Sequence, residues 1–302
     1  MEEVIVMEYN TFKEEIVKDI VNELGEEVDI DFCEIYCLNH NGTEGLVITD
    51  FEKRIRPVFP IELFYNCYLV GKINMEDIKE LAKIRLSEEA KDLTSIMENI
   101  LEEEIQENIF LRLINYEKNE DWLQKLPHRK FLDLAVVYYI ERENTSCYDY
   151  IVNINNALLT ELQMTEEELF RLALRNSMQK KKAEIKCIQD MFSKCFWCLF
   201  GITEEEPEIP MYVLTNENKK YGASCLLYKG VLEELAEQVK DDLYILPSSI
   251  QEVIIIPKSF VPGVERLKEL VKEVNRDMVL EEEVLGDSVY YLDCQNNNMD
   301  LV

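Results

Sequence analysis

The spacing of apolar residues predicts that the chain begins with an amphipathic helix and continues into a β-hairpin. Between residues 12 and 24, apolar side chains recur every four positions, which is close to the helical period. Thr11 opens the sequence Thr-Phe-Lys-Glu, which has the spacing of a capping box at a helix start. Residues 28–38 and 43–49 alternate around residues 39–42, Asn-His-Asn-Gly, whose Asn-Gly pair favours a tight turn.

Helices are predicted after the hairpin. Residues 61–69 and 75–86 follow the helical period and are separated by Gly71. Asn74 directly precedes the second of these helices and is expected to be its N-cap. Residues 93–101 carry a narrow apolar stripe at offsets of three and four, which predicts a helical connector.

The middle of the chain contains the most continuous apolar run. Residues 131–140 are almost all apolar, which is typical of a strand buried on both faces. A short strand is expected near Ile109, a helix around Trp122, and a strand at 148–153 that pairs with the central one. Thr165 opens a Thr-Glu-Glu-Glu sequence, a second capping box that predicts a helix.

The last third of the chain has the most regular pattern. Residues 179–206 are expected to form a linker helix, and residues 295–298, Gln-Asn-Asn-Asn, to be frayed because they have nothing apolar to bury. The remaining periodicity predicts strands at 211–215, 222–227, 243–246, 252–256 and 289–292, with helices at 231–239 and 263–275.

These elements predict an α+β (mixed α/β) protein of two or three small sheet-and-helix units, with mixed or antiparallel sheets and helices packed on them. The expected units are an N-terminal one at 1–91 and a middle one at 92–183, built on a central strand at 131–141. A helical linker at 184–210 then leads to a C-terminal unit at 211–302.

Composition limits the possible partners. The 302 residues include 61 acidic and 32 basic side chains and carry a net charge of −29, a field that repels nucleic acids and anionic lipids. No apolar stretch reaches the roughly 18 residues that a membrane-spanning helix needs, and the acidic first residues do not resemble a secretory signal. Nine cysteines at scattered positions favour reduced thiols. We therefore expect a cytoplasmic protein.

Several strings of residues resemble a known family. They are Leu126-Pro-His with the run at 131–137, Tyr212-Val-Leu-Thr-Asn, Tyr221-Gly-Ala, and residues 242–249, Asp-Leu-Tyr-Ile-Leu-Pro-Ser-Ser. The chain resembles, from its first helix to Tyr291, a family catalogued only as a domain of unknown function and common in gut Clostridia. The resemblance implies a bacterial cytosolic protein, and it brings no established activity, cofactor or catalytic residue.

Four polar residues are candidates for a catalytic site. His128 precedes the most buried run and titrates near neutral pH, so it is suited to acid or base chemistry. Asp133 lies within that run, where a carboxylate must be paired, protonated or at a solvent-facing edge. Ser248 and Tyr221 lie in loops beside predicted strands. The structural interpretation is favoured for each, because no nucleophile is tied to His128 and no G-x-S-x-G sequence surrounds Ser248.

Cofactor and metal motifs are incomplete. Cys187, Cys195 and Cys198 form the one metal-like group, but a structural zinc site needs a fourth ligand and both histidines are far away in sequence. Packing of these cysteines in a core is the favoured interpretation. Nine glycines form neither of the common phosphate-binding sequences, so no cofactor is expected.

One basic segment stands out in this acidic chain. Between Arg171 and Lys186 there are six basic residues, including Lys180-Lys-Lys182. This segment is suited to an acidic partner or to the protein's own acidic face. Lys and Arg are also common in the last turn of a helix, and that structural role is the favoured explanation.

The leading hypothesis is a non-catalytic cytosolic protein that binds or regulates another protein, because every catalytic or metal arrangement lacks a required member. The alternative is a hydrolase-type enzyme with its site near His128, between the middle and C-terminal units. A structural zinc site is a third possibility. The sequence leaves the oligomeric state open.

Overall fold

The structure is a computed structural model that describes residues 7–24, 29–48, 58–86, 102–142, 150–187, 210–261 and 263–302. The chain forms two compact units, Met1–Leu101 and Glu102–Val302. The expected connector helix at 93–101 and the strand start at 148–149 lie outside the described residues.

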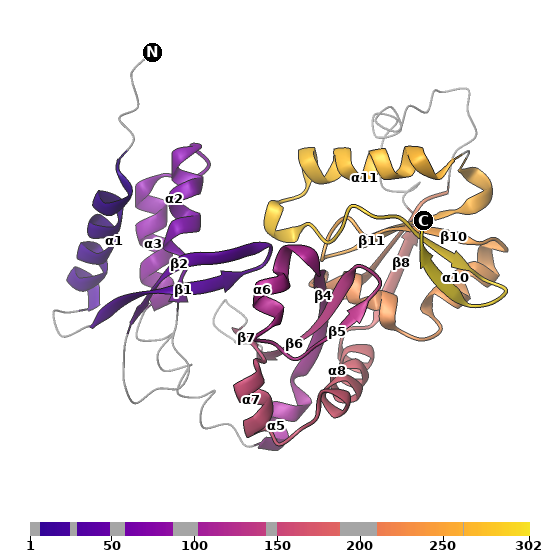
Figure 1. Ribbon diagram of the computed structural model, residues 1–302, viewed down its shortest axis with the longest axis horizontal. Helices are drawn as coiled ribbons and strands as arrows, with labels where there is room; N and C mark the ends of the chain where they lie inside the picture. The colour runs from indigo at the N-terminus through magenta and orange to yellow at the C-terminus, as the bar shows by residue number, and fades with distance from the viewer. Residues whose placement is uncertain are drawn as a thin grey trace, which may run out of the picture. The chain divides into compact units, whose positions relative to one another are not determined.

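In the described residues of the first unit, three helices pack with a three-stranded antiparallel sheet (Figure 1). Its core is made of fully buried side chains from both layers, such as Phe12 and Ile16 of the first helix and Leu46 and Phe59 of the sheet. Its elements are α1 (Tyr9–Leu24), β1 (Ile30–Cys37), β2 (His40–Ile48), β3 (Val58–Phe59), α2 (Ile61–Leu69) and α3 (Met75–Leu86).

Two details of the first unit differ from expectation. Helix α1 begins at Tyr9, so Thr11 lies inside the helix and is not its cap. The hairpin turns two residues earlier than expected, because Cys37 pairs with His40 and Asn39 adopts a left-handed φ of 61°, a conformation that Asn tolerates.

The predicted cap of α3 is confirmed by the backbone N–H of Asp77, which donates to Asn74 Oδ1 at 2.9 Å.

The second unit begins with a four-stranded antiparallel sheet centred on a long strand, β6. Strand β4 pairs along one edge of β6, while β5 and β7 pair with successive halves of it. Helix α8 packs on β4, and its predicted capping box is present, with Thr165 as N-cap and Glu168 bonding back. The elements are α5 (Glu102–Glu107), β4 (Ile109–Asn115), α6 (Glu120–Leu123), β5 (His128–Phe131), β6 (Leu134–Arg142), β7 (Tyr150–Asn153), α7 (Asn156–Glu161) and α8 (Glu166–Lys180).

The apolar run at 131–140 is not one strand. Strand β5 ends at Phe131, and β6 starts at Leu134, which pairs with Phe131 across a tight hairpin. Leu132 makes the turn with φ 54°. Asp133 therefore lies in a turn and not within a strand. The central strand expected at 131–141 begins three residues late because hydrophobicity alone does not report a turn made by an apolar residue.

A six-stranded antiparallel sheet completes the second unit, in the order β13-β12-β10-β11-β9-β8. Helix α11 lies along one face of this sheet (Figure 1) and buries Leu267 and Val271 against Leu246 and Ile256. Its elements are β8 (Ala183–Cys187), β9 (Tyr212–Asn216), the 3₁₀ helix η3 (Gly222–Leu227), α10 (Val231–Val239), β10 (Leu243–Leu246), β11 (Val253–Pro257), α11 (Val264–Met278), β12 (Tyr290–Asp293) and β13 (Asn298–Leu301).

Three sequence-based expectations for this region are wrong. Residues 184–187, expected to begin a helical linker, belong to strand β8, which pairs with β9; residues 188–209 lie outside the described part. Residues 222–227 form η3 rather than a strand. The tail forms β13, because Asp293 Oδ1 accepts the backbone N–H groups of Gln295 and Asn296 and turns the chain back onto β12.

The α+β class with antiparallel sheets is confirmed, since the described residues form sheets of three, four and six strands together with helices. The expected parts 92–183 and 211–302 both fall largely within the unit Glu102–Val302. No helix among the described residues is long and apolar enough to cross a bilayer.

A close approach of backbones explains why residue 222 is glycine. A Cβ atom there would collide with Thr215 Oγ1 and with the carbonyl oxygen of Gln251, and it would lie 2.8 Å from the backbone nitrogen of Asn216. We expect Gly222→Ala to lower the free energy of unfolding by at least about 2 kcal/mol, the usual cost of overpacking a core. Urea denaturation measures this effect.

Gly263→Ala is the matched control, because nothing lies within 4 Å of a Cβ at that position. Equal stability losses in the two variants would contradict the role given to Gly222.

Candidate functional site

The two sheets of the second unit meet along a seam that contains buried charged and aromatic side chains. Strand β4 contacts η3 there. Arg112, Glu141 and Lys181 are all less than 8% exposed, although charged residues are seldom buried without a partner. We use "seam" for the surface where Arg112 and Glu141 of the four-stranded sheet meet Tyr221 and the residues around it.

Arg112 is the centre of the seam. Its Nη2 donates to Asn153 Oδ1 at 2.7 Å, and its guanidinium carbon lies 4.8 Å from the ring centre of Tyr221. The ring of Tyr139 meets that of Tyr221 edge-on at 5.2 Å. Burial raises the pKa of Tyr139 well above its usual value, and nearby Glu141 raises it further. Among the described residues, Arg112 Nε and Tyr139 Oη have no hydrogen-bond partner.

A buried ion cluster lies beside Arg112. Glu141 forms ion pairs with two lysines, Lys181 through Oε2 and Lys220 through Oε1 at 2.7 Å. The ammonium group of Lys181 also lies 4.5 Å from the ring centre of Phe110, a cation–π distance. The cluster joins β6, the end of α8 and the loop between β9 and η3.

Asp133 connects the β5–β6 turn to strand β12. Its Oδ2 accepts the hydroxyl of Ser288 at 2.6 Å and its Oδ1 accepts the hydroxyl of Tyr290 at 2.5 Å. Burial raises the pKa of Tyr290 above its usual value, and the negative charge of Asp133 adds to the rise. The carboxylate of Asp133 is thus paired, and its partners are Tyr290 of β12 and Ser288, two residues before that strand.

His128 lies apart from Asp133. It starts β5 opposite Val137, and its Nδ1 is 3.0 Å from the carbonyl oxygen of Leu126. Strand β5 lies between His128 and the turn that holds Asp133. The length of this four-residue strand is about 10 Å, at about 3.3 Å per residue. Both carboxylate oxygens of Asp133 already accept hydroxyls, so the suggested His128–Asp133 pairing is not formed.

The other two catalytic candidates have structural contacts. Ser248 is 8% exposed, and its carbonyl oxygen accepts the backbone N–H of Leu285 at 3.0 Å. Tyr221 has a left-handed φ of 55° and donates its backbone N–H to Gln251 Oε1. No hydrogen bond within the described chain joins any two of His128, Asp133, Tyr221 and Ser248.

The cysteine group is only partly described. Cys187 is a half-buried residue of β8, whereas Cys195 and Cys198 lie outside the described residues. In the part of the chain that the structure covers, no group of three His, Cys, Asp or Glu side chains is arranged to hold a metal ion.

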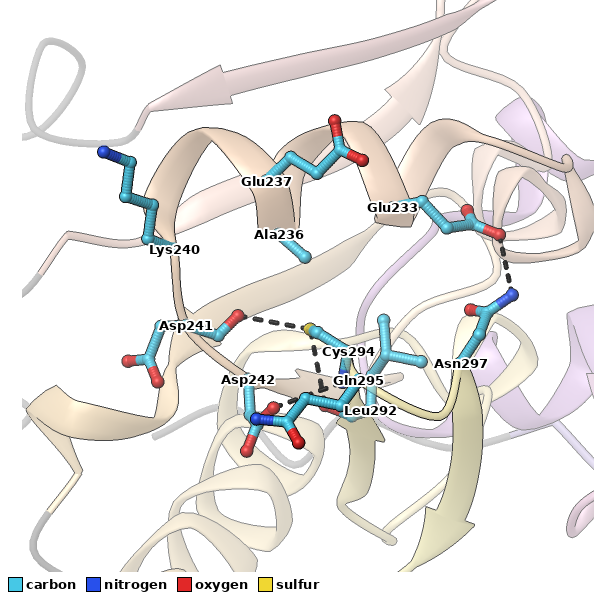
Figure 2. A pocket seen from close by; sticks show the side chains of 10 residues that line it. All are labelled: Glu233, Ala236, Glu237, Lys240, Asp241, Asp242, Leu292, Cys294, Gln295 and Asn297. Atoms are coloured by element: carbon cyan, nitrogen blue, oxygen red, sulfur yellow. Dashed lines mark hydrogen bonds between the residues drawn. The ribbon is translucent and has the colours of Figure 1, made fainter.

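A hollow with a volume of about 430 Å³ lies at the surface of the six-stranded sheet, between α10 and the β12–β13 turn (Figure 2). We call it the acidic hollow. Its charged lining consists of Glu233, Glu237, Asp241 and Asp242 against the single lysine Lys240. Asn297 Nδ2 donates to Glu233 Oε1 at 3.1 Å, and a dashed line in Figure 2 marks this hydrogen bond.

Hydrogen bonds hold one wall of the acidic hollow in place. Asp242 accepts the hydroxyl of Tyr291 at 2.5 Å and pairs with Lys258 at 3.2 Å, and the Tyr291 bond is the main cause that lowers the pKa of Asp242. Burial, together with nearby carboxylates, raises the pKa of the Cys294 thiol to about 11. Cys294 is therefore protonated near neutral pH and is a poor nucleophile.

Sequence reasoning missed most residues of the seam. Arg112 interrupts the apolar run Ile-Phe-Leu-Arg-Leu-Ile, and a charge inside such a run was a visible signal of a buried pair. Glu141 lies two residues after Tyr139 in β6, so the alternation of side chains along the strand places both on the same face. No local signal identified Lys181 as the partner, because the pairing depends on how the chain folds back.

Comparison with known proteins identifies a family for this chain. The model of a family of unknown function (DUF5688) matches residues 9–294, which confirms the resemblance to a domain of unknown function. No curated protein and no solved structure matches this chain.

The structural role of Asp133 can be tested by substitution. Asp133→Asn removes the negative charge and one acceptor, so that either Ser288 or the fully buried Tyr290 hydroxyl faces an NH₂ group that cannot accept its hydrogen bond. We expect a loss of about 1 to 3 kcal/mol in the free energy of unfolding, the cost of an unmet buried hydrogen bond. Asp121→Asn, at an exposed position of α6, is the control and should change stability by less than about 0.5 kcal/mol.

The raised pKa of Tyr290 predicts an alkaline loss of stability. Above about pH 10 the folded state keeps this proton while the unfolded state releases it, so Tyr290 alone lowers the free energy of unfolding by about 1.4 kcal/mol per pH unit. The other buried tyrosines with raised pKa, such as Tyr138 and Tyr139, add to this fall. Tyr290→Phe should make this fall shallower. Tyr116→Phe removes a hydroxyl outside the Asp133 network and should keep the wild-type slope. Urea denaturation from pH 9 to pH 12 compares the three proteins, and identical slopes would contradict the assignment.

Proposed function

We propose, from the premise that this chain belongs to the DUF5688 family of unknown function, that it is a non-catalytic protein-binding or regulatory protein. We place it in the bacterial cytoplasm, in an organism of the gut Clostridia. Its partner in this proposal is another protein, which inserts a lysine or arginine side chain into the acidic hollow.

The charge of the acidic hollow carries this proposal. Four carboxylates and one ammonium group line a hollow that opens at the surface. Glu237 is exposed on α10 and is available to a partner. A guanidinium group presents several N–H donors that match carboxylates in a forked geometry. The lining is therefore complementary to a positively charged side chain.

The size of the acidic hollow supports a side chain rather than a large ligand. A volume of about 430 Å³ is near the lower end of the range for small-molecule pockets, about 300 to 1,000 Å³. The net charge of −29 adds a long-range field that attracts a basic partner and speeds the encounter.

The alternative proposal, a hydrolase near His128, has less support. Its residues are used in separate structural contacts, with Asp133 bonded to Ser288 and Tyr290. Hydrolysis by a serine needs a nucleophile and a base within hydrogen-bond reach of each other. Ser248 and His128 share no hydrogen bond within the described chain.

Binding of a fluorescent Lys/Arg-rich peptide tests the proposal. We expect saturable binding by fluorescence anisotropy that weakens as salt rises. Glu237→Lys replaces an attraction with a repulsion and should weaken binding about tenfold, since each exposed pair contributes up to about 1 kcal/mol.

Glu234→Lys is the matched control because Glu234 lies on the same helix, is exposed and does not line the acidic hollow. Equal weakening by both variants would show that only the overall charge matters. A Glu/Asp-rich peptide that binds as well would also contradict the proposal.

A further inference from the structure

A second hollow in the same unit has the opposite charge. It has a volume of about 230 Å³ and is lined by Asn108, Phe110, Glu141, Lys180, Lys181 and Asn218. We call it the lysine hollow. It lies where the start of β4, the end of β6, the end of α8 and the loop after β9 come together. The two hollows share no lining residue.

The charges of the lysine hollow are unusual for this protein. Lys180 and Lys181 line it, and Lys220 is held against its wall by the ion pair with Glu141. The carboxylates of Glu141 and Glu107 oppose these three ammonium groups. Oε2 of Glu107 lies 3.9 Å from Nζ of Lys180. These described residues therefore carry a net charge of +1, although the whole chain carries −29.

Lys181 is buried more deeply than a helix end requires. Lysines in the last turn of a helix interact favourably with its dipole while they stay in solvent, as Lys180 does with a side chain 46% exposed. Lys181 is only 4% exposed. Burying an ammonium group costs free energy even when it is paired, so the helix dipole alone does not explain its position.

The aromatic rings in the wall of the lysine hollow strengthen the charge interactions inside it. Lys181 lies 4.5 Å from the ring centre of Phe110 and 5.4 Å from that of Tyr139. Such apolar rings lower the local dielectric constant, which makes charge interactions stronger than in water. Glu141 fixes Lys181 and Lys220 through different oxygens, so both ammonium groups are positioned before any ligand arrives.

We propose that the lysine hollow binds a small oxyanion, the carboxylate or phosphate group of a low-molecular-weight ligand. Lys180 and Lys181 supply the positive charge, and the exposed side-chain amide of Asn218 supplies a neutral donor. At about 30 Å³ per water molecule, the hollow has room for a phosphate group and a few further atoms. This site goes beyond the proposed function and lies on different residues.

Titration of the ¹⁵N-labelled full chain with inorganic phosphate tests the site. We expect saturable chemical-shift changes at the backbone amides of Asn108, Lys181 and Asn218. Sodium chloride at the same ionic strength should not reproduce them. Acetate distinguishes the two ligand chemistries: binding as tight as that of phosphate indicates a carboxylate ligand, weaker binding indicates a phosphate ligand, and both results support the proposal.

Lys180→Gln should weaken phosphate binding about three- to fivefold, the effect of removing one partly exposed charge pair. The control is Lys272→Gln, which removes an exposed lysine of α11 and the same net charge, and it should leave the affinity unchanged. The double variant Lys180→Gln/Lys181→Met should abolish saturation. Asn218→Ala is a second probe at an exposed position and should also weaken binding if the double variant does not fold.

Three results would overturn the proposal. They are the absence of saturable shifts with both phosphate and acetate, an equal loss of affinity in Lys180→Gln and Lys272→Gln, and shifts caused by an acidic peptide but by neither small anion. The peptide result would identify this surface as a protein interface instead.

Discussion

Compensation of buried charge between the two sheets is the constraint on which the second unit depends. A guanidinium or a carboxylate removed from water is stable only beside an opposite charge or a hydrogen-bond partner. Arg112 meets this requirement through Asn153 and two aromatic rings, and Glu141 through two lysines. Asp133 accepts the hydroxyl of Tyr290 in β12 and that of Ser288, just before this strand. These contacts fix how the two sheets face each other.

The same constraint separates structural from functional residues. Polar residues that attract attention in the sequence, such as Asp133 and Tyr221, are used to hold the sheets together. The residues proposed for recognition line the acidic hollow beside α10 and the lysine hollow at the end of α8. In the two proposals made above, one unit recognises a basic side chain at one hollow and a small anion at the other.

The sequence predicts those parts of the fold that local physics determines. The caps at Asn74 and Thr165 were predictable because the side chain bonds a backbone N–H three residues away. The same local pattern failed at Thr11, which lies inside α1, and other patterns failed where distant residues decide. Ala183–Cys187 becomes a strand because β9 is there to pair with it, and residues 222–227 form η3 in place of the predicted strand. The lysine hollow shows the same limit, since Lys181 meets Glu141 across 40 positions of sequence.

The strand order of the six-stranded sheet has a consequence for colloidal behaviour. Its outermost strands in the described chain are β13 and β8, and outermost strands are where two copies of a protein can join into larger aggregates. Both are short, and both carry charged side chains, Asp300 on one and Glu184 and Lys186 on the other. Association of two copies through the edge strands of this sheet is thus disfavoured, while the two hollows stay open to other molecules.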